Sequence, residues 1–223
     1  KLKKIVECQY VHGVNLMCQH LLPFEEHGQR KRDYPAHFSS ANPWVKKGFL
    51  QFNDYFSYLG KLIAESKEYV NIGVFHPIRS AYFDYKRYDE RNRSGIAPLQ
   101  YSIESLVKEL GKKGLAYHFL DETIMSKYGK VENKTLVVGN CKYDYIIFPE
   151  IYTMDKSSER LISQYVKAGG KILFTGGKPS YLEGEKFDYS YLEANTSWDE
   201  IINAQPVKIG ENEGVRLSYR RDE

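Results

Sequence analysis

The sequence predicts an α/β fold, a parallel sheet with helices on both faces, for residues 69–180. Short apolar runs of strand length alternate there with stretches in which apolar residues recur at helical spacing. The apolar runs are nearly continuous, as is typical of strands that are buried on both faces. Single helical stretches separate successive runs, and this order favours parallel strands with helices packed on both sides of the sheet.

The N-terminal region of the chain has a different pattern. Residues 1–12 show helical spacing and Gly13 follows them, so we expect a helix that ends there. The apolar run at 14–18 predicts a short, buried parallel strand. Residues 20–49 contain five Pro and Gly residues, which predicts a long functional loop. Helical spacing returns at 52–66 and predicts a second helix.

The α/β region gives four strands and two helices. The strands are predicted at 70–75, 116–120, 145–148 and 171–175, and the helices at 99–110 and 157–168. We expect Ser157 or Ser158 to cap the second helix at its start, and Gly169 and Gly170 to end it.

Two connections and the C-terminal tail complete the chain. Residues 79–97 predict a charged, aromatic loop, and residues 131–138 predict a hairpin that turns at Asn133 and Lys134. The tail is weakly patterned until residues 215–220, which alternate at period two like the first strand of a further β domain. Four strands in about 110 residues fit the flavodoxin-like (class I amidotransferase-like) group of doubly wound sheets.

The composition excludes several classes of protein. Of the 223 residues, 42% are hydrophobic and 27% are charged, so a packed core is expected and general disorder is excluded. The formal net charge is only +3, and Asp33 offsets the short basic run at 30–32, so no nucleic-acid partner is expected. No apolar run is long enough to span a bilayer, so no membrane partner is expected.

Cysteine and tyrosine usage adds two expectations. Cys8, Cys18 and Cys141 have no motif spacing, which indicates neither a disulfide framework nor a metal site. Cys18 and Cys141 lie in apolar runs and are expected to be buried thiols. The 19 tyrosines suit a surface that must be both flat and wet, as for carbohydrate or protein partners, although any single Tyr also fits an ordinary strand.

The expected carboxyl ends of the strands, where doubly wound sheets bind ligands, argue against a built-in active site. The first strand leads into Pro77 without a glycine before Gly95, so it offers no phosphate cradle and no nucleotide or flavin cofactor is expected. The later turns carry neither a Cys nor a Gly-x-Ser-x-Gly elbow for a nucleophile. Asp121, Glu122 and Glu150 end strands as well, and we expect these acidic side chains to be solvated.

The long loop has the chemistry of a sugar site. Its imidazole, carboxylate, guanidinium and aromatic groups are His20, Glu25, Glu26, His27, Arg30, Lys31, Arg32, Asp33, Tyr34, His37, Asn42 and Trp44. Sugar sites use charged groups for hydroxyls and an aromatic platform for the apolar ring face. (β/α)₈ barrels place such sites on the loops after their strands. The alternative is a loop that is held together by its own ion pairs.

Two sets of motifs resemble known families. The first set is GVNL (13–16) with His20, GQRKRDYP (28–35), HFS (37–39) and NPW (42–44). It resembles the last barrel segment of large bacterial glycoside hydrolases related to α-L-rhamnosidases. The second set is YDYIIFP (143–149) and YVKAGGKI (165–172). It is similar to the flavodoxin-like domain that follows the barrel in family 42 β-galactosidases, where that domain is used in trimer assembly.

The resemblance implies three regions. Residues 1–66 would be the terminal segment of a TIM-type (β/α)₈ barrel with its long active-site loop. Residues 69–180 would be a flavodoxin-like structural or oligomerisation domain, and residues 181–223 a linker with the first strand of a further β domain. Because barrel closure needs all eight strands, we expect the 223 residues alone to be inactive.

The resemblance also implies a function for the full-length protein. It would be a bacterial hydrolase that cleaves glycosidic bonds with two carboxylates supplied by other barrel strands. The residues implied to contact the substrate are His20, Arg30, Arg32, Asp33 and Trp44. A carbohydrate is the implied ligand, with homo-oligomer or intramolecular domain contacts and a secreted or periplasmic location.

Two other functions remain open from the sequence. The chain could be a non-catalytic module that assembles protein partners through its aromatic loop and the edge of its sheet. A small-molecule sensor of flavodoxin type is a third hypothesis, which the missing phosphate loop weakens.

Overall fold

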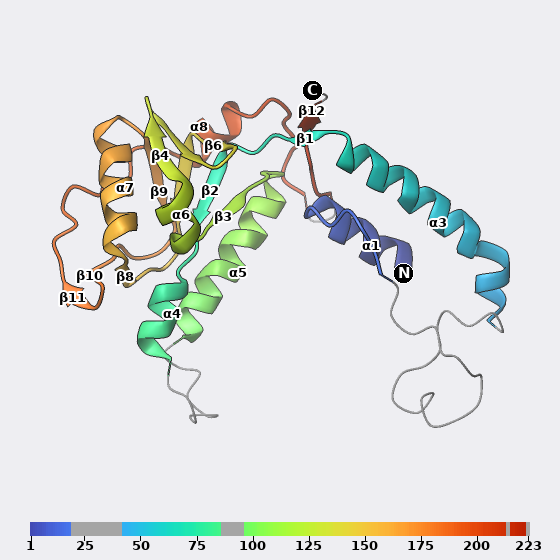
Figure 1. Cartoon of the computed structure of the whole chain (residues 1–223), viewed down its shortest axis with the longest axis horizontal. Coiled ribbons are helices and arrows are strands. Elements are labelled where there is room, and N and C mark those ends of the chain that lie inside the picture. Colours follow the sequence, from blue (N-terminus) through green and yellow to red (C-terminus); the bar gives the residue numbers. More distant parts are fainter. Residues whose placement is uncertain (19–41, 86–95, 213–214, 222–223) are drawn as a thin grey trace. The chain divides into compact units, whose positions relative to one another are not determined.

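The computed structural model describes residues 1–18, 42–85, 96–212 and 215–221. The chain divides into two compact units (Figure 1). Unit 1 consists of Lys1–Tyr69 together with Arg220–Glu223, and unit 2 of Val70–Tyr219. None of the described helices combines the length and the apolar composition that a membrane-spanning helix needs.

The described residues of unit 1 form two helices and a small strand pair. Its elements are α1 (Leu2–Val11), α3 (Pro43–Ala64), β1 (Lys67–Glu68) and β12 (Arg220–Arg221), with the two strands antiparallel. Helix α3 starts well before the predicted residue 52. Pro43, which is predicted to lie in the loop, occupies the first turn of the helix, where its missing N–H is not needed. Only Val6, Tyr10 and Phe56 are buried hydrophobics in the described residues of this unit.

The strand predicted at 14–18 is wrong. This segment instead continues the end of α1: Gly13, at φ +93°, donates its N–H to Tyr10 O, and Val14 donates to Gln9 O. Leu16 is 83% exposed, and Cys18 is exposed rather than buried. An apolar run becomes a strand only where a neighbouring strand pairs with it, and none does here among the described residues.

Unit 2 is built on a four-stranded parallel sheet, as predicted. Its strands are β2 (Ile72–Phe75), β3 (His118–Leu120), β7 (Tyr145–Phe148) and β9 (Lys171–Phe174). They lie in the order β3-β2-β7-β9, and all three pairings are parallel. The first two of these strands in the sequence, β2 and β3, are therefore neighbours. The later strands β7 and β9 extend the sheet on the other side of β2.

Helices cover both faces of this sheet (Figure 1). They are α5 (Ala97–Lys112) and α8 (Trp198–Asn203) on one face, and α6 (Glu122–Tyr128) and α7 (Lys156–Lys167) on the other. Leu110 of α5 packs with Val74 and Ile147 in one core. Ile162 of α7 packs with Ile146 in the second core. Alternate residues of each strand thus enter opposite cores, which explains the nearly continuous apolar runs.

The end of the sheet carries a row of phenylalanines. Phe148 stacks on Phe75 with ring centroids 5.0 Å apart, and on Phe174 with centroids 5.1 Å apart. Each of these residues is the last of its strand. The register places them side by side, so this row closes one core at the carboxyl edge.

Further short strands surround the sheet. They are β4 (Gly129–Glu132), β5 (Thr135–Val138), β6 (Cys141–Tyr143), β8 (Thr153–Met154), β10 (Tyr181–Leu182) and β11 (Glu185–Lys186), of which the first three form an antiparallel sheet. The predicted hairpin turn is confirmed, with Asn133 at φ 56°. Cys141 begins β6 and is only partly buried.

Three other predictions need correction. Helix α4 (Ile78–Asp84) replaces the first segment of the loop predicted at 79–97. Pro77 is the N-cap residue of this helix, and the polar residues of the segment follow it. Asp155, and not Ser157 or Ser158, is the N-cap of α7. Residues 215–219 form no strand, and β12 begins only at Arg220.

Candidate functional site

Most of the predicted substrate contacts lie outside the described residues: His20, Arg30, Arg32 and Asp33. The fifth, Trp44, is in the first turn of α3. Its ring meets that of Phe49 edge to face, with centroids 5.7 Å apart, and 36% of the residue is exposed. An aromatic face is therefore available at Trp44, whereas the grouping of the five residues stays a prediction.

Unit 1 has an open groove of about 660 Å³ between α1, residues 15–17 and α3. Aromatic rings such as Tyr10, Phe52 and Phe56 line it, with a few polar groups such as Asn53 and Lys61. No carboxylate is among the described residues that line it. This groove can accept an apolar group, but its described walls offer no pair of acids for glycosidic hydrolysis.

The carboxyl edge of the parallel sheet in unit 2 is the other place to expect a ligand. Glu150, which follows β7, is held there by hydrogen bonds of its carboxylate and of its backbone N–H. Its carboxylate accepts the Gly177 N–H at 2.7 Å, and its own N–H donates to Ser102 Oγ at 2.7 Å. A side chain on Gly177 would approach this carboxylate to 2.8 Å, so the glycine permits the close contact. Glu150 thus joins two strand-end turns and α5.

Asp121, after β3, begins the helix α6. Its carboxylate accepts the N–H of Ile124 at 3.0 Å, the geometry of a helix N-cap. This bond explains why a helix starts here although the sequence shows little periodicity over seven residues. Asp121 has a structural role in this arrangement.

Glu122 is the unusual acid at this edge, because it is only 1% exposed. The expectation that it is solvated is wrong. One carboxylate oxygen, Oε2, accepts the Asp155 N–H at 2.7 Å. The other, Oε1, and the nearby Ser158 Oγ are buried and have no hydrogen-bond partner among the described residues. Burial raises the pKa of Glu122 to about 7, although the Asp155 N–H, the Ser158 hydroxyl and Arg79 oppose the change.

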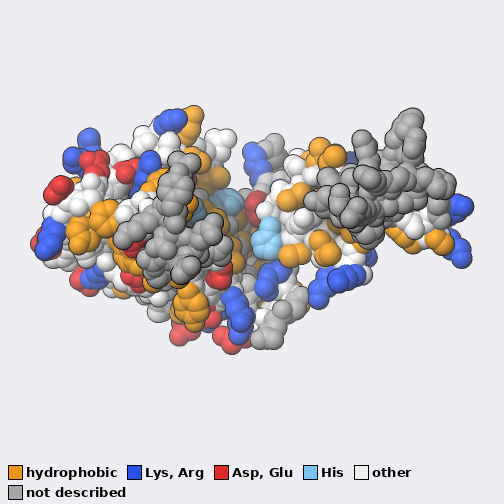
Figure 2. Space-filling model, turned by 90° about the horizontal axis from the view of Figure 1, so that it is seen from below, with side chains coloured by type: hydrophobic (Ala, Val, Ile, Leu, Met, Phe, Trp, Pro, Cys, Tyr) orange, Lys and Arg blue, Asp and Glu red, His pale blue; other side chains and the backbone are white. Residues whose placement is uncertain are grey.

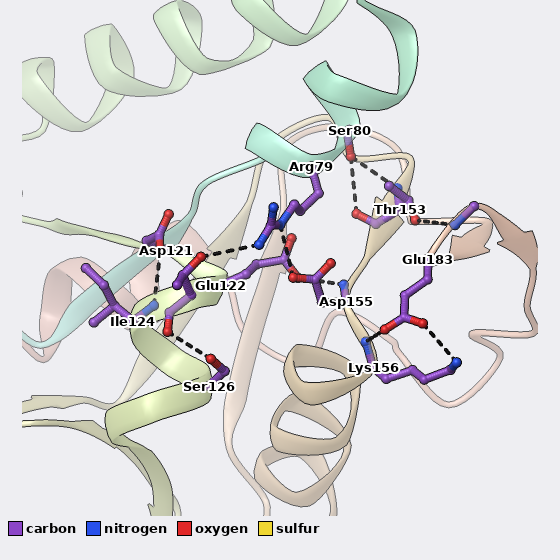
Figure 3. A network of polar contacts seen from close by, with 12 residues as sticks. Arg79, Ser80, Asp121, Glu122, Ile124, Ser126, Thr153, Asp155, Lys156 and Glu183 are labelled. Carbon is purple, nitrogen blue, oxygen red and sulfur yellow. Dashed lines mark hydrogen bonds and ion pairs between the residues drawn. The ribbon is translucent and has the colours of Figure 1, made fainter.

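Arg79 binds two residues next to this acid, Asp155 and Thr123 (Figure 3). From α4 its Nε forms an ion pair with Asp155 Oδ2 at 3.0 Å, and its Nη2 donates to Thr123 Oγ1 at 3.3 Å. One residue further along α4, the buried Ser80 Oγ accepts the N–H of Thr153 at 3.1 Å. The cluster therefore fastens α4, α6 and the start of α7 to one another.

The polar contacts of this cluster have a structural role, because they hold neighbouring elements together. Glu122 has a pKa suited to proton transfer, but its carboxyl group is closed off from a substrate. Among residues 1–18, 42–85, 96–212 and 215–221, no three His, Cys, Asp or Glu side chains are grouped so that they could hold a metal ion. Sequence reasoning missed Arg79 and Asp155. Asp155 carried a signal, since it directly precedes an amphipathic helix.

Comparisons with known proteins give a fold likeness. A rhamnosidase from Novosphingobium sp. PP1Y aligns with a TM-score of 0.53 and 16% identity, over 82% of this chain and 16% of that one. A cold-adapted β-galactosidase from Rahnella sp. R3 aligns with a TM-score of 0.34 and 15% identity, over 56% of this chain and 17% of that one. No protein-family model and no curated protein matches the sequence. The chain has a distant glycoside-hydrolase-like fold and spans 16% of the rhamnosidase.

Proposed function

We propose that this chain is a segment of a larger carbohydrate-active enzyme of the glycoside hydrolase class, in which unit 2 is a non-catalytic structural or oligomerisation domain. The alignment with the rhamnosidase carries the proposal. It covers 82% of the chain. Unit 2 makes up only about two thirds of the chain, so the alignment extends into unit 1. The aligned residues therefore include part of unit 1 as well as the α/β sheet.

The strand order supports a flavodoxin-like assignment for unit 2. Counted along the sequence, the parallel strands lie in the order second, first, third and fourth, which matches the first four strands of the flavodoxin-like order. The acids at the carboxyl edge support a non-catalytic role. Glu150 and Asp121 accept backbone N–H groups, and Glu122 is closed off from solvent.

In the same proposal, unit 1 is the last segment of a (β/α)₈ barrel. Its helix α3 is 22 residues long and buries only Phe56, which suits a helix that packs on further elements. Trp44 would provide an aromatic platform for a sugar ring, with His20, Arg30, Arg32 and Asp33 as hydroxyl contacts. The catalytic carboxylates would come from other strands of the barrel.

Turnover of aryl glycosides by the full-length protein tests this proposal. We expect activity from the full-length protein and none from the 223 residues alone. Trp44→Ala in the full-length protein should lower kcat/KM by about tenfold, the effect of losing one aromatic stacking contact. Tyr58→Ala is the matched control, since Tyr58 lies on the same helix and is 65% exposed. It should change kcat/KM less than about twofold. Absence of turnover on every aryl glycoside would count against the proposal.

A second candidate function is assembly with protein partners, including a second copy of this chain. Exposed aromatic side chains on or beside α4 and α5 favour it: Tyr82 is 64%, Tyr85 61% and Tyr101 75% exposed. Hydrophobic side chains alternate with charged ones on the face drawn in Figure 2. Tyrosine is enriched at such mixed protein interfaces.

Light scattering on the purified chain tests this second function. A stable oligomer that forms without sugar, and that Tyr82→Ser with Tyr85→Ser dissociates, would support it. Tyr128→Ser is the control, because Tyr128 is 62% exposed on another helix. A monomer at all concentrations would exclude homo-oligomerisation through this surface.

A further inference from the structure

The hairpin of β10 and β11 borders an open hollow on unit 2 that none of the roles proposed above uses. The hollow has a volume of about 330 Å³, and its lining residues are Ser180, Tyr181, Lys186, Phe187 and Asp188. They belong to the two strands or lie directly beside them. Aromatic rings, an ammonium group and a carboxylate therefore border one small space, and a single hairpin supplies all of them.

Neighbouring elements hold this hairpin in a fixed shape. Its two-residue turn consists of Glu183 and Gly184, with φ angles of 50° and 88°, as in the type I′ turns that suit the twist of a hairpin. Glu183 forms an ion pair with Lys156 at 2.8 Å (Figure 3), and its N–H donates to Met154 O at 2.9 Å. Strand β10 also pairs with β8 in parallel. The hollow is thus preorganised, which lowers the entropy that a ligand loses on binding.

The aromatic rings at the hollow are fixed in place and partly exposed. Tyr181 packs against Phe83 of α4 with ring centroids 5.3 Å apart, and Phe83 is 49% exposed. Phe187 is 38% exposed and meets the buried Tyr189 with ring centroids 4.7 Å apart. The Tyr189 hydroxyl donates to Tyr181 O at 3.0 Å, so the two rings share one support. Such rings suit a ligand with an apolar face and polar edges, and a sugar ring has this form.

The polar groups at the hollow complement sugar hydroxyls. Lys186 lies opposite Tyr181 in the register of the hairpin, which places its ammonium group and the ring on the same side. Within the part of the chain that the structure describes, neither the Lys186 ammonium nor the Tyr181 hydroxyl has a hydrogen-bond or ion-pair partner. The N–H and the hydroxyl of Ser190 orient Asp188 by donating to its two oxygens at 2.9 and 3.1 Å. Each carboxylate oxygen can accept a further hydrogen bond.

We propose that this hollow is a carbohydrate-binding site of unit 2, and that its ligand is a neutral oligosaccharide. One sugar ring stacks on Tyr181, while Lys186 donates to a hydroxyl and Asp188 accepts from another. The site is separate from the substrate contacts proposed for unit 1. It binds without cleaving, so it requires neither the barrel nor a hydrolase activity of the full-length protein.

The charges around the hollow favour a neutral sugar over an anionic one. Glu185 and Asp188 each carry a negative charge, and Lys186 carries the positive charge that faces them. The charge of Glu183 is matched by that of Lys156. Negative charge is therefore in excess, and it opposes a uronic acid or a sugar phosphate. A neutral sugar meets no such repulsion.

Amide NMR of the 223-residue chain tests the proposal, because it reports binding residue by residue. The neutral probes are cellotetraose, mannotetraose, galactotetraose and a rhamnose disaccharide, and tetragalacturonate is the anionic comparison. We expect at least one neutral probe to shift the signals of Tyr181, Lys186 and Phe187 with a Kd on the order of 1 mM, as suits a small, open site. Tetragalacturonate should bind more weakly. Unchanged signals at these residues with all four neutral probes would overturn the proposal, as would shifts confined to unit 1.

Two variants examine the proposed contacts separately. Tyr181→Ala removes the ring and should raise the Kd of the neutral probe about tenfold. Lys186→Met removes only the ammonium group at an exposed position and should raise it about fivefold. Lys134→Met is the matched control, since Lys134 is exposed in the turn between β4 and β5, and it should change the Kd less than about twofold.

Two results would contradict the assignment of the hollow to a sugar. One is a Kd that neither Tyr181→Ala nor Lys186→Met changes. The other is a shift of the same signals with protein concentration in the absence of sugar, which would show that the hollow is a contact between copies of the chain.

Discussion

The two units differ in how much of their apolar surface they bury by themselves. In the described part of unit 2, two cores lie on opposite faces of a parallel sheet, one of sixteen buried residues and one of eight. The core of unit 1 contains three buried residues in the stretches of chain that the structure describes. Unit 1 nevertheless has the longer helix, α3, with Leu50 73% and Leu62 46% exposed. Helical periodicity is thus strong in both units, whereas burial is concentrated in unit 2.

This difference shows that amphipathic pattern and stability are separate properties. A helix draws most of its stability in water from the packing of its apolar face. Helix α5 packs Leu106 and Leu110 into a core, whereas α3 buries Phe56 alone. We therefore expect substitutions in unit 2 to have large effects on unfolding and equivalent substitutions in unit 1 to have small ones.

The two tryptophans make this comparison measurable. Trp44 belongs to unit 1 and Trp198 to unit 2. In a Trp44→Phe background, fluorescence reports on unit 2, and in a Trp198→Phe background it reports on unit 1. Unfolding of each unit can then be followed in the intact chain.

Replacement of a core leucine should have the largest effect. Leu110→Ala in α5 should lower the free energy of unfolding of unit 2 by about 2–5 kcal/mol, because it leaves a cavity at a fully buried site. Leu50→Ala is the matched change on α3, where Leu50 is exposed, and should shift stability by less than about 0.5 kcal/mol. Urea denaturation with the two reporters measures both. Similar losses for the two variants would contradict the contrast between the units.

Removal of one buried hydroxyl should have an intermediate effect. Tyr165 Oη donates to Asp144 O at 2.6 Å and accepts the Lys171 N–H at 2.9 Å, which ties α7 to the start of β9. Tyr165→Phe leaves both backbone groups without this partner and should cost unit 2 about 1–3 kcal/mol. Denaturation monitored at Trp198 gives the value. Tyr101→Phe, at a 75% exposed position, should leave the transition unchanged.

Loss of the hydrogen bonds that Arg220 makes at the end of α3 should have a smaller effect on stability, confined to unit 1. Arg220 donates to the carbonyls of Ile63 and Ser66 at 2.8 and 2.7 Å, and its Nε donates to Ser66 Oγ at 2.7 Å. Arg220→Lys keeps the favourable charge at the helix C-terminus but loses the fork of donors, so we expect a loss of about 1 kcal/mol. The Trp44 signal should report this loss, and a shift at Trp198 instead would show that the assignment to unit 1 is wrong.

The smallest effect is expected from an exposed ion pair on α3. Lys61 and Glu65 approach to 3.8 Å with about two thirds of each side chain exposed. Solvent screens such a pair, so Lys61→Met should change the unfolding midpoint of unit 1 by no more than the error of the fit. A clear decrease that disappears in high salt would contradict this view of the pair.

The sequence was most informative where burial decides the structure. The run at 145–148 is apolar at every position, and β7 occupies those four residues. The hairpin at 131–138 and the parallel sheet also followed from local pattern. The errors lie where a capping residue or a tertiary partner decides. Pro43 and Pro77 suggested loops but precede or begin helices, and the apolar run at 14–18 lacks a partner strand among the described residues.

The polar cluster of unit 2 could be predicted only to a limited extent. Asp121 and Glu122 were identified as strand-end acids. That Asp121 caps a helix whereas Glu122 is buried depends on where α4 and α7 pack. The buried carboxylate of Glu122 accepts the N–H of Asp155, 33 residues further along the chain, and Asp155 in turn pairs with Arg79. Contacts between residues this far apart in the sequence follow no periodicity or motif spacing, so they could not be inferred from the sequence. The predicted sugar contacts at 20–33 lie outside the described residues and stay predictions.

The pairing of β1 with β12 has a mechanical consequence. The chain leaves unit 1 after β1 and returns to it at β12, and Lys67 pairs with Arg221 while Glu68 pairs with Arg220. Tension on the two outer ends of this pair would reach Lys67 and Arg221 first. The hydrogen bonds between the strands would then break one after another and not all at once. This unzipping geometry requires little force. The pair would therefore yield before any load reached the parallel sheet of unit 2.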